Sequence, residues 1–372
     1  MIGQYIQQPA GYRAFVPSSF PPADLRLSKK VEESLEAATL SIGRLDGITE
    51  LLLDIDFFIF MYIRKEAALS SQVEGTRATM VDAMKAEIAL TSGLPEDVDD
   101  ILRYIAALNQ GIKMLDEFPL TFRLIREVHE TLLSDGGRSH GHAFPGQIRT
   151  TQNWINGGSP ATARYVPPPP HLIGECLSEI EKFIHDSEAC QTLVRAGLAH
   201  AQFETVHPFV DGNGRTGRML VTFMLCQSKA LSKPVLYLSE FFKANRDAYF
   251  ERLQAYHDSS DIEGWLLFFL EGVREVADQA ICTVRAINAL RDQDMALMAT
   301  FGKNSKTATR VLQHLFAQPV VSVRTVEGWA GIARPNANAL VDKFVAAGIL
   351  FQTDETKEYG RTFAYRNYLE IF

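Results

Sequence analysis

The sequence predicts a mainly α-helical protein that ends in a small unit of helices and short strands. Residues 29–90 carry apolar side chains at helical spacing. Residues 99–135 and 171–275 show further helical patterns, and a Gly- and Pro-rich stretch at 136–170 separates them as loop and short hairpin. Residues 303–372 combine helical stretches with β-rich runs. These three observations favour a helical bundle followed by a separate C-terminal domain.

The N-terminal region starts with a Pro- and aromatic-rich segment, up to about residue 25, which we expect to lie on the surface as an extended arm. Leu35, Ala38 and Ile42 then place apolar side chains on one face of a helix. The most apolar stretch, residues 51–63, contains two Asp residues and is too short to span a bilayer. It therefore predicts a buried helix.

A break between two helices is predicted at residues 74–76. Gly75 suits a C-terminal helix cap because glycine adopts the left-handed conformation without strain. Thr79, with Asp82 three residues later, has the spacing of a capping box. The next helix should therefore begin next to Thr79.

The C-terminal unit follows a long helical segment around 273–298. It shows two short helical stretches, a third at 335–347, and two β-rich runs at 349–352 and 362–365 that a polar turn joins. This order of elements is the one expected of a winged helix.

Composition and charge limit the classes of function. The chain has 372 residues, 46% of them hydrophobic and 22% charged, which is typical of a globular protein with two or three structural units. A net charge of -8 and a pI of about 5.7 argue against nonspecific binding of nucleic acid by the whole chain. Any DNA binding would have to be local.

Cysteine spacing and the N-terminus indicate a reducing compartment. The four cysteines have no CxxC spacing and no neighbouring His cluster, so neither zinc nor a disulfide framework is predicted. The first 20 residues lack the basic start and apolar run of a signal peptide. We therefore expect a cytoplasmic protein that does not bind membranes. The cysteines are Cys176, Cys190, Cys226 and Cys282.

The strongest motif is HPFVDGNGRTGR at residues 207–218. Its glycines permit a turn whose N–H groups converge, and the turn opens an apolar helix whose N-terminus favours negative charge. Arg215 and Arg218 lie three apart on that helix and could clamp phosphate oxygens. Asp211 could hold Mg²⁺ through one carboxylate, and His207 lies where a base could take a proton from a hydroxyl.

This string resembles the Fic family, whose pattern HPFx(D/E)GNGRxxR it matches at every defined position. The resemblance extends to about residue 275 and implies a Fic-type helical bundle that acts as a protein adenylyltransferase. Such an enzyme transfers AMP from ATP to a protein hydroxyl and releases pyrophosphate. His207 would be the base and Asp211 the magnesium ligand. The implied phosphate ligands are Gly212, Asn213, Gly214, Arg215 and Arg218.

Two further segments resemble parts of the family. PGQIR at 145–149 and GGSPATARYVPPP at 157–169 resemble a small β-hairpin flap, which would pair with an extended target segment by strand addition. A plain Pro-rich surface loop is the alternative. Residues 237–242 and the helix after them resemble the segment that lines the adenine pocket, although aromatic residues at this spacing also suit a core. The implied nucleotide contacts are Asn245, Tyr249 and Tyr256.

A third resemblance lies far upstream, where SSQVEG at 70–75 fits the family's inhibitory pattern (S/T)xxxE(G/N). Ser70 and Glu74 are four residues apart and share a helix face. By resemblance, Glu74 would pair with Arg218, remove the γ-phosphate clamp and leave ATP in a nonproductive pose. A carboxylate that faces a guanidinium makes such competition physically reasonable.

The patterns together predict four parts and one main function. The parts are an N-terminal arm and helical region with the inhibitory helix, a Fic catalytic core with the flap, a linking helix and a winged-helix-like domain, at 1–98, 99–275, 276–302 and 303–372. The expected substrates are ATP, with Mg²⁺, and hydroxyls of Ser, Thr or Tyr on target proteins. A homodimer is left open.

Two alternatives to this function are also left open. One is a nucleotide-sensing, DNA-binding transcriptional regulator, because residues 301–372 carry nine Lys and Arg against six Asp and Glu, a net charge of +3. The expected recognition helix weakens it, since Lys343 is its cation and Asp342 lies beside it. The other is a Fic enzyme that mainly removes AMP, which would use the same residues.

Overall fold

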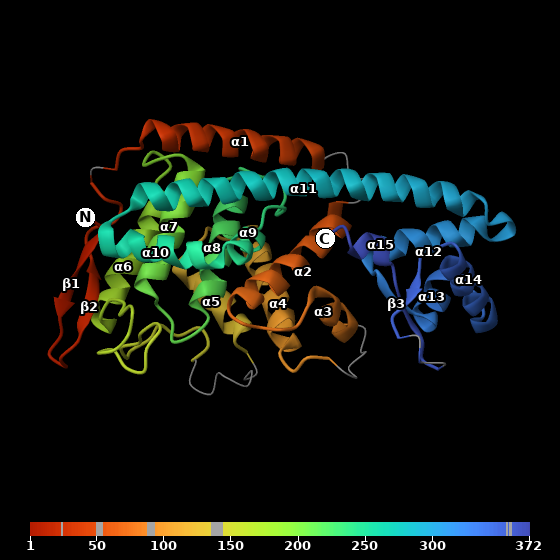
Figure 1. Ribbon diagram of the computed structural model, residues 1–372, viewed down its shortest axis with the longest axis horizontal. Coiled ribbons are helices and arrows are strands. Elements are labelled where there is room, and N and C mark those ends of the chain that lie inside the picture. Colours follow the sequence, from red (N-terminus) through yellow and green to blue (C-terminus); the bar gives the residue numbers. More distant parts are fainter. Residues whose placement is uncertain (24, 50–54, 88–93, 135–143, 355, 357–358) are drawn as a thin grey trace.

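The computed structural model describes residues 1–23, 25–49, 55–87, 94–134, 144–354, 356 and 359–372. A helical body occupies one end of the elongated molecule, a smaller C-terminal unit occupies the other, and one long helix runs between them (Figure 1). The predicted mainly α-helical fold is confirmed. The helices of the body are α1 (Lys29–Thr49), α2 (Ile55–Val73), α3 (Met80–Glu87), α4 (Val98–Leu115), α5 (Phe122–Leu132), the short 3-10 helix η1 (Pro170–Leu172), α6 (Ile173–His185), α7 (Thr192–Val206), α8 (Asn213–Gln227), α9 (Ser239–Ala244), α10 (Arg246–Ser259) and α11 (Ile262–Ala299).

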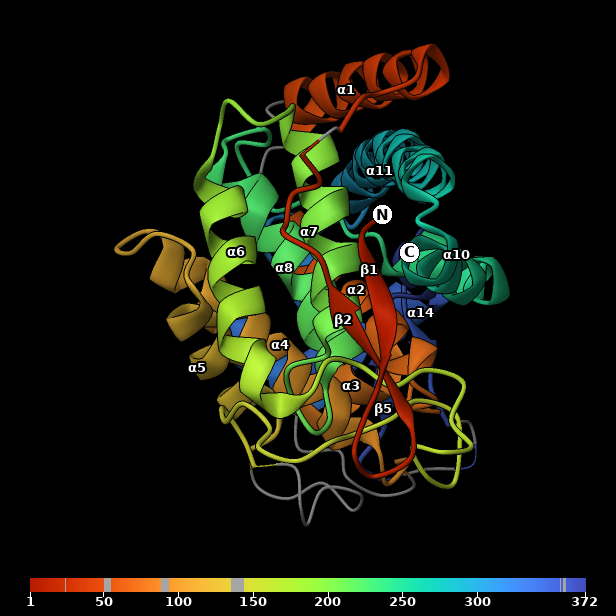
Figure 2. The same cartoon turned by 90° about the vertical axis from the view of Figure 1, so that its left-hand side faces the viewer.

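The N-terminal segment is a hairpin rather than the extended arm that the sequence predicted. Strands β1 (Gly3–Gln7) and β2 (Arg13–Pro17) pair antiparallel from Gly3 opposite Pro17 to Gln7 opposite Arg13. The ring of Phe15 is buried, and its backbone N–H donates to the carbonyl of Val166 at 2.8 Å. The buried ring and the strand pairing hold the segment against the body, where Figure 2 shows it crossing in front of α7 and α8.

Helix α11 is 38 residues long and continuous, so the predicted boundary between residues 275 and 276 lies inside it. The expected linking helix is the second half of this element. Its start is fixed by Asp261, whose side chain accepts from the N–H of Gly264. Position 272, within the helix, is a glycine; a Cβ there would come within 2.5 Å of the Phe241 ring. Helix α1 packs along α11 on the outside of the body (Figures 1 and 2).

The predicted boundaries between α2 and α3 agree with the structure. Helix α2 ends at Val73, and Gly75 follows with φ of +104°. Thr79 and Asp82 form the expected capping box, because the Thr79 N–H donates to the Asp82 carboxylate and the Asp82 N–H donates to Thr79 Oγ1. The buried helix expected at 51–63 is the start of α2, although residues 51–54 lie outside the described part of the chain.

Residues 144–169 contain one isolated bridge, between Ile155 and Tyr165, in place of the regular flap hairpin that the sequence predicted. Proline lacks the N–H that a strand ladder needs, and 167–170 is a run of four prolines. The flap is therefore a loop with a single strand-like contact. Residues 136–143 of the predicted loop lie outside the described residues.

The C-terminal unit packs three helices on a small antiparallel sheet whose strand order is β3-β5-β4. Helix α14 begins at Arg334 rather than Pro335, so its first residue is a second cation besides Lys343. The winged-helix interpretation stays a prediction. The elements are the 3-10 helix η2 (Gly302–Asn304), α12 (Ser305–Ala317), β3 (Val320–Ser322), α13 (Val323–Ala330), α14 (Arg334–Ala346), β4 (Phe351–Gln352), β5 (Thr362–Ala364) and α15 (Arg366–Leu369).

The C-terminal unit also contacts the body. Tyr365 Oη donates a buried hydrogen bond to Asp294 of α11. The ring of Phe372 packs edge-on against Tyr62 of α2, with centroids 5.7 Å apart. The unit is therefore fixed to both α11 and α2. Among the described residues, no helix is long and apolar enough to cross a membrane.

Candidate active site

The predicted motif lies where α7 ends and α8 begins. His207 closes α7 in the left-handed conformation, with φ of 49° and ψ of 61°, and its N–H donates to the Phe203 carbonyl at 2.9 Å. A residue with a Cβ rarely adopts this conformation, so the surrounding contacts must hold it there. The turn brings His207 to the same end of the body as the N-terminus of α8.

Asn213 closes the loop between the two helices. Its Oδ1 accepts from the Phe209 N–H, and its Nδ2 donates to the Phe209 carbonyl, both at 2.9 Å. Gly212 precedes it with φ of 76°, which suits glycine. The Asn213 side chain is therefore engaged in holding the loop. The group of Asn213 that suits a phosphate is its backbone N–H, at the N-terminus of the helix.

Arg218 is almost fully buried and bonds to the segment 70–75, which the sequence predicted to be inhibitory. Its Nε donates to Ser70 Oγ at 2.8 Å, and its Nη2 donates to the Ser70 carbonyl at 2.9 Å and to Glu74 Oε1 at 2.8 Å. Burial lowers the pKa of Arg218, but Glu74, Tyr249 and Tyr104 together outweigh burial, and the pKa is raised overall. The pairing of Glu74 with Arg218 that the sequence predicted is present in the structure, and the bonds to Ser70 are an addition to it.

Glu74 also covers the first turn of α8. A Cβ built on Gly214 would lie 2.3 Å from Glu74 Oε1, so glycine is the residue that leaves room for this carboxylate. The side chain of Glu74 is 39% exposed, whereas that of Arg218 is 2% exposed. The carboxylate thus occupies the space in front of backbone N–H groups that would otherwise face an anion.

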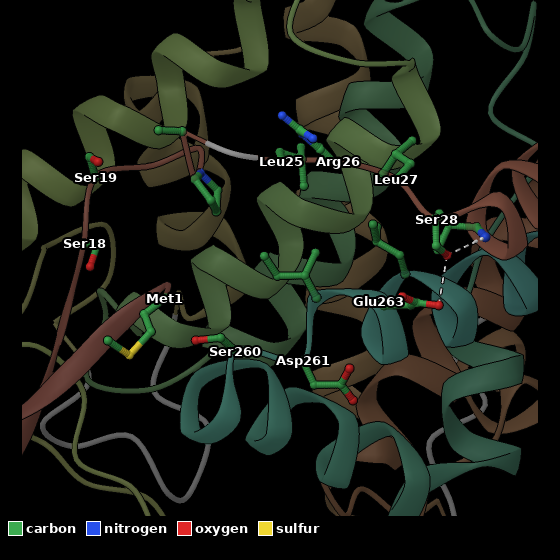
Figure 3. A pocket seen from close by; sticks show the side chains of 15 residues that line it. Met1, Ser18, Ser19, Leu25, Arg26, Leu27, Ser28, Ser260, Asp261 and Glu263 are labelled. Carbon is green, nitrogen blue, oxygen red and sulfur yellow. Dashed lines mark hydrogen bonds between the residues drawn. The ribbon is translucent and has the colours of Figure 1, made fainter.

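A cavity of about 750 Å³ extends from this point toward α10. His207, Gly214, Arg218 and Glu74 line it together with aromatic side chains, among them Tyr249 and Phe250 of α10 and Trp154 of the flap loop. This volume and mixed lining suit a small molecule that carries both anionic and flat apolar groups. A second cavity, of about 490 Å³, lies between the N-terminal segment and the start of α11, and none of the predicted site residues is among the described residues that line it (Figure 3).

Several predicted residues do not line the cavity beside the motif. Tyr256 is fully buried, and Asn245 Nδ2 donates to the Phe241 carbonyl, so neither side chain faces the cavity in this structure and their contact with a nucleotide stays a prediction. Tyr249 and Tyr256 are seven residues apart and share a face of α10, but only Tyr249 lines the cavity, and its hydroxyl lies 2.9 Å from His200 Nε2. Arg215 Nη1 lies 3.9 Å from Asp100 and away from the lining.

His207 is neutral at physiological pH. Burial and then the positive charge of Arg149 lower its pKa, Glu74 and Asp211 act in the opposite direction, and the net result is a pKa of about 4. A neutral imidazole can accept a proton, as a base must. Nδ1 lies 4.0 Å from the Glu204 carboxylate, on the same face of α7.

Sequence reasoning missed two site residues. Glu204 lines the cavity, and burial raises its pKa to about 8, so it holds a proton at neutral pH. Its position three residues before His207 was the available signal, because that spacing puts both on one helix face. Arg149 was assigned to the flap, but its side chain is buried under the motif.

The fold and the site define a helical protein with an anion-binding helix N-terminus and a neutral buried histidine at a ligand-sized cavity. Residues 32–113 match the N-terminal part of the Fic/DOC family, and residues 119–225 match the Fic/DOC family itself. These two regions span about half of the chain. The chain belongs to the Fic/DOC family.

Curated relatives share this region. The chain is 33% identical over 114 residues to the protein adenylyltransferase fic-1 of Caenorhabditis briggsae, which covers 28% of the chain and 21% of the relative. It is 27% identical over 215 residues to the protein adenylyltransferase Fic of Drosophila grimshawi, covering 55% and 40%. The chain thus spans less than half the length of these relatives.

Solved structures share the fold. A Fic family protein from Desulfovibrio desulfuricans G20 has a TM-score of 0.59 at 16% identity and covers 92% of this chain and 97% of that one. A Fic domain containing signaling protein from Bacteroides thetaiotaomicron has a TM-score of 0.54 at 18% identity, covering 68% and 97%. The first match includes most of the C-terminal unit as well as the body.

Proposed function

We propose that this protein transfers AMP from ATP to hydroxyl groups of target proteins. The observation that carries the proposal is the cavity that His207, Arg218 and Gly214 of the first turn of α8 line together with aromatic side chains. Anionic phosphates suit the helix N-terminus and the guanidinium, because both attract them. A purine suits the aromatic side chains. The names of the curated relatives, protein adenylyltransferases, support the same reaction.

In this reaction the hydroxyl oxygen of the target forms a bond to the α-phosphorus, and the bond from that phosphorus to the oxygen of the leaving pyrophosphate breaks. His207 takes the hydroxyl proton, which its lowered pKa of about 4 permits at neutral pH. Arg218 and the N–H groups of the first turn of α8 hold the charge that builds up on the phosphate oxygens. Arg215 would join them only after its side chain turns from Asp100.

Asp211 is the residue that fits a magnesium ion. It lies in the loop at the N-terminus of α8, and its Oδ1 accepts from the Gly212 N–H at 2.6 Å. Mg²⁺ in nucleotide sites is usually held by one or two carboxylates and the substrate phosphates, so a single Asp beside the phosphate site is sufficient. A bound ion would neutralise phosphate charge. In the described part of the chain, no three His, Cys, Asp or Glu side chains gather into a site that could hold a metal unaided.

Glu74 is proposed to restrain the enzyme. Its carboxylate bonds to Arg218 and fills the space beside Gly214, which are the two groups that an anionic phosphate would use. ATP that binds with Glu74 in place must keep its γ-phosphate away from Arg218, so the α-phosphorus is misaligned for attack. The restraint is therefore competition for one guanidinium.

The acceptors are proposed to be hydroxyls of Ser, Thr or Tyr, since His207 can deprotonate any of them.

The C-terminal unit is proposed to be a winged helix that docks targets. DNA binding is the second use of such a unit, but Arg361 of its sheet lies 3.6 Å from Asp342 of α14, which partly neutralises the surface that would face phosphate. A gel shift that weakens steeply with salt would favour DNA.

The proposed reaction predicts that His207→Ala removes AMP transfer but not ATP binding. Both are measured in the Glu74→Gly background, with α-labelled ATP and candidate target protein for transfer and calorimetry for binding. Loss of the base should lower transfer by about 100-fold or more, because general-base catalysis contributes about that much. Equal labelling by the two proteins would contradict the role of His207.

A further inference from the structure

Arg149 is a buried cation without a carboxylate partner among the described residues. Its side chain is 3% exposed, and its hydrogen bonds go to backbone carbonyls. Nε donates to His207 at 2.8 Å and Nη1 to Thr151 at 3.2 Å, while Nη2 donates to Pro168 at 2.6 Å and to Val206 at 3.3 Å. Burial of an unpaired guanidinium is costly, and burial lowers the pKa of Arg149 to about 10.

These bonds converge on the end of α7. The last carbonyls of a helix have no intrahelical donor, and Arg149 supplies donors for those of Val206 and His207. Its backbone N–H donates to the next carbonyl, that of Pro208, at 2.9 Å. Three successive carbonyls around the left-handed His207 are thus held by one residue. A cation at a helix C-terminus is also favourable because that end carries partial negative charge.

The same charge acts on the imidazole. After burial, Arg149 is the next largest influence that lowers the pKa of His207. The opposing groups come from the other elements packed around the ring: Glu74 after α2, Glu204 on α7 through its carbonyl, and Asp211 in the motif loop. Two of these are carboxylates that would favour an imidazolium. Arg149 offsets them.

We propose that Arg149 is a positioning residue for His207: it fixes the left-handed backbone that aims the imidazole, and its charge acts together with burial to keep the imidazole unprotonated. Its effect on AMP transfer rests on the proposed function, whereas its effect on the His207 imidazole does not. The segment 145–149 is therefore part of the support of the motif rather than part of the flap. Its glycine contributes as well, because the Gly146 N–H donates at 2.9 Å to His129, which contacts the Asp211 carbonyl.

The test compares Arg149→Met with Arg149→Lys and uses Arg195→Met as the control. Arg195 is also a buried arginine, and it donates to two carbonyls, those of Asp186 and Cys190. It lies near the N-terminal end of α7, whereas Arg149 contacts the C-terminal end. Histidine-labelled, nucleotide-free protein is titrated by NMR, and the His207 signal is assigned by its loss in His207→Ala. Thermal unfolding reports whether each variant folds.

Arg149→Met should raise the pKa of His207, and Arg149→Lys should raise it less because the charge stays. In the Glu74→Gly background, both should lower kcat for AMP transfer by about tenfold or more, since small misplacements of a catalytic group are costly. The KM for ATP should change by less than about threefold. Arg195→Met should leave both the His207 pKa and kcat at the values of the unmodified background.

An unchanged His207 pKa in folded Arg149→Met would overturn the proposal. If Arg149→Met does not fold, Arg149→Lys decides it: unchanged kcat overturns the positioning role, and a lowered kcat with folded protein supports it. If the Glu74→Gly background shows no AMP transfer at all, the proposed function fails. The NMR titration then still decides whether Arg149 controls His207.

Discussion

At the scale of single residues, the contact between the inhibitory segment and Arg218 consists of several bonds of unequal strength. Glu74 contributes a charge-assisted bond, while Ser70 contributes its hydroxyl and its carbonyl. Only the hydroxyl bond can be removed without moving the backbone. It links Arg218 Nε to a helix, α2, that is itself well packed, so it should add to the restraint without being its main source.

Ser70→Ala should therefore raise AMP transfer moderately, by about tenfold or less, because a hydrogen bond to a charged group is worth at most about 1.5–3 kcal/mol and Glu74, which stays in place, keeps much of the restraint. Initial rates of labelling from ATP give the comparison. Ser71→Ala is the matched control, since Ser71 is equally buried but its Oγ has no hydrogen-bond partner within the part of the chain that the structure describes. Equal rates for the two variants would exclude a part for the Ser70 hydroxyl.

At the scale of elements, α2 determines where the restraint lies. Glu66, two turns before Glu74, is buried, and its carboxylate accepts from Tyr104 Oη at 2.9 Å and from Ser239 Oγ at 2.5 Å. These bonds fix α2 to α4 and to the start of α9. The position of Glu74 beside α8 thus follows from the packing of a whole helix and not from the ion pair with Arg218 alone.

The elements also show what the sequence could reveal. Short sequence patterns predicted the structure correctly where the residues that interact are close in sequence. The capping box at Thr79, the glycine after α2 and the motif at 207–218 all agree with the structure. Helical spacing alone could not tell which aromatic side chain of α10 faces the cavity, because Tyr249 and Tyr256 are both buried and differ only in what packs on them.

Long-range contacts account for the other differences. Arg149 stands 58 residues before the carbonyl that it holds, so no local pattern relates them. The N-terminal hairpin is stabilised by the burial of Phe15 beside Val166, again far away in the sequence. The Phe241 ring lies so close to Gly272 of α11 that a Cβ there would come within 2.5 Å of it, and a glycine within a helical pattern does not reveal such a contact.

At the scale of the whole molecule, the C-terminal unit and the inhibitory helix share an interface. Phe372 packs on Tyr62 of α2 and on Tyr368 of α15. The body and the C-terminal unit should therefore stabilise each other. Truncation of the chain after the long helix, at the boundary that the sequence predicts, would expose the Tyr62 face of α2 to water.

Phe372→Ala should lower stability by about 1–3 kcal/mol, less than a fully buried phenylalanine would, because its ring is only partly buried. Thermal unfolding should show a fall of a few degrees in Tm. Tyr359→Ala is the control, since this side chain in the same unit is 91% exposed and should leave Tm unchanged. Identical Tm values for the two variants would mean that the interface with α2 contributes nothing.

Competition between Glu74 and the γ-phosphate for Arg218 is tested most directly by the rate of AMP transfer in four proteins. These are the parent, Glu74→Gly, Arg218→Ala and the double variant. Glu74→Gly should raise transfer by about tenfold or more, because it removes a charge-assisted bond to the guanidinium that the γ-phosphate needs. In the double variant this gain should vanish, since both changes act through one contact and cannot be additive. Transfer by Glu74→Gly at the parent rate with intact ATP binding, or an equal gain in the Arg218→Ala background, would contradict the account.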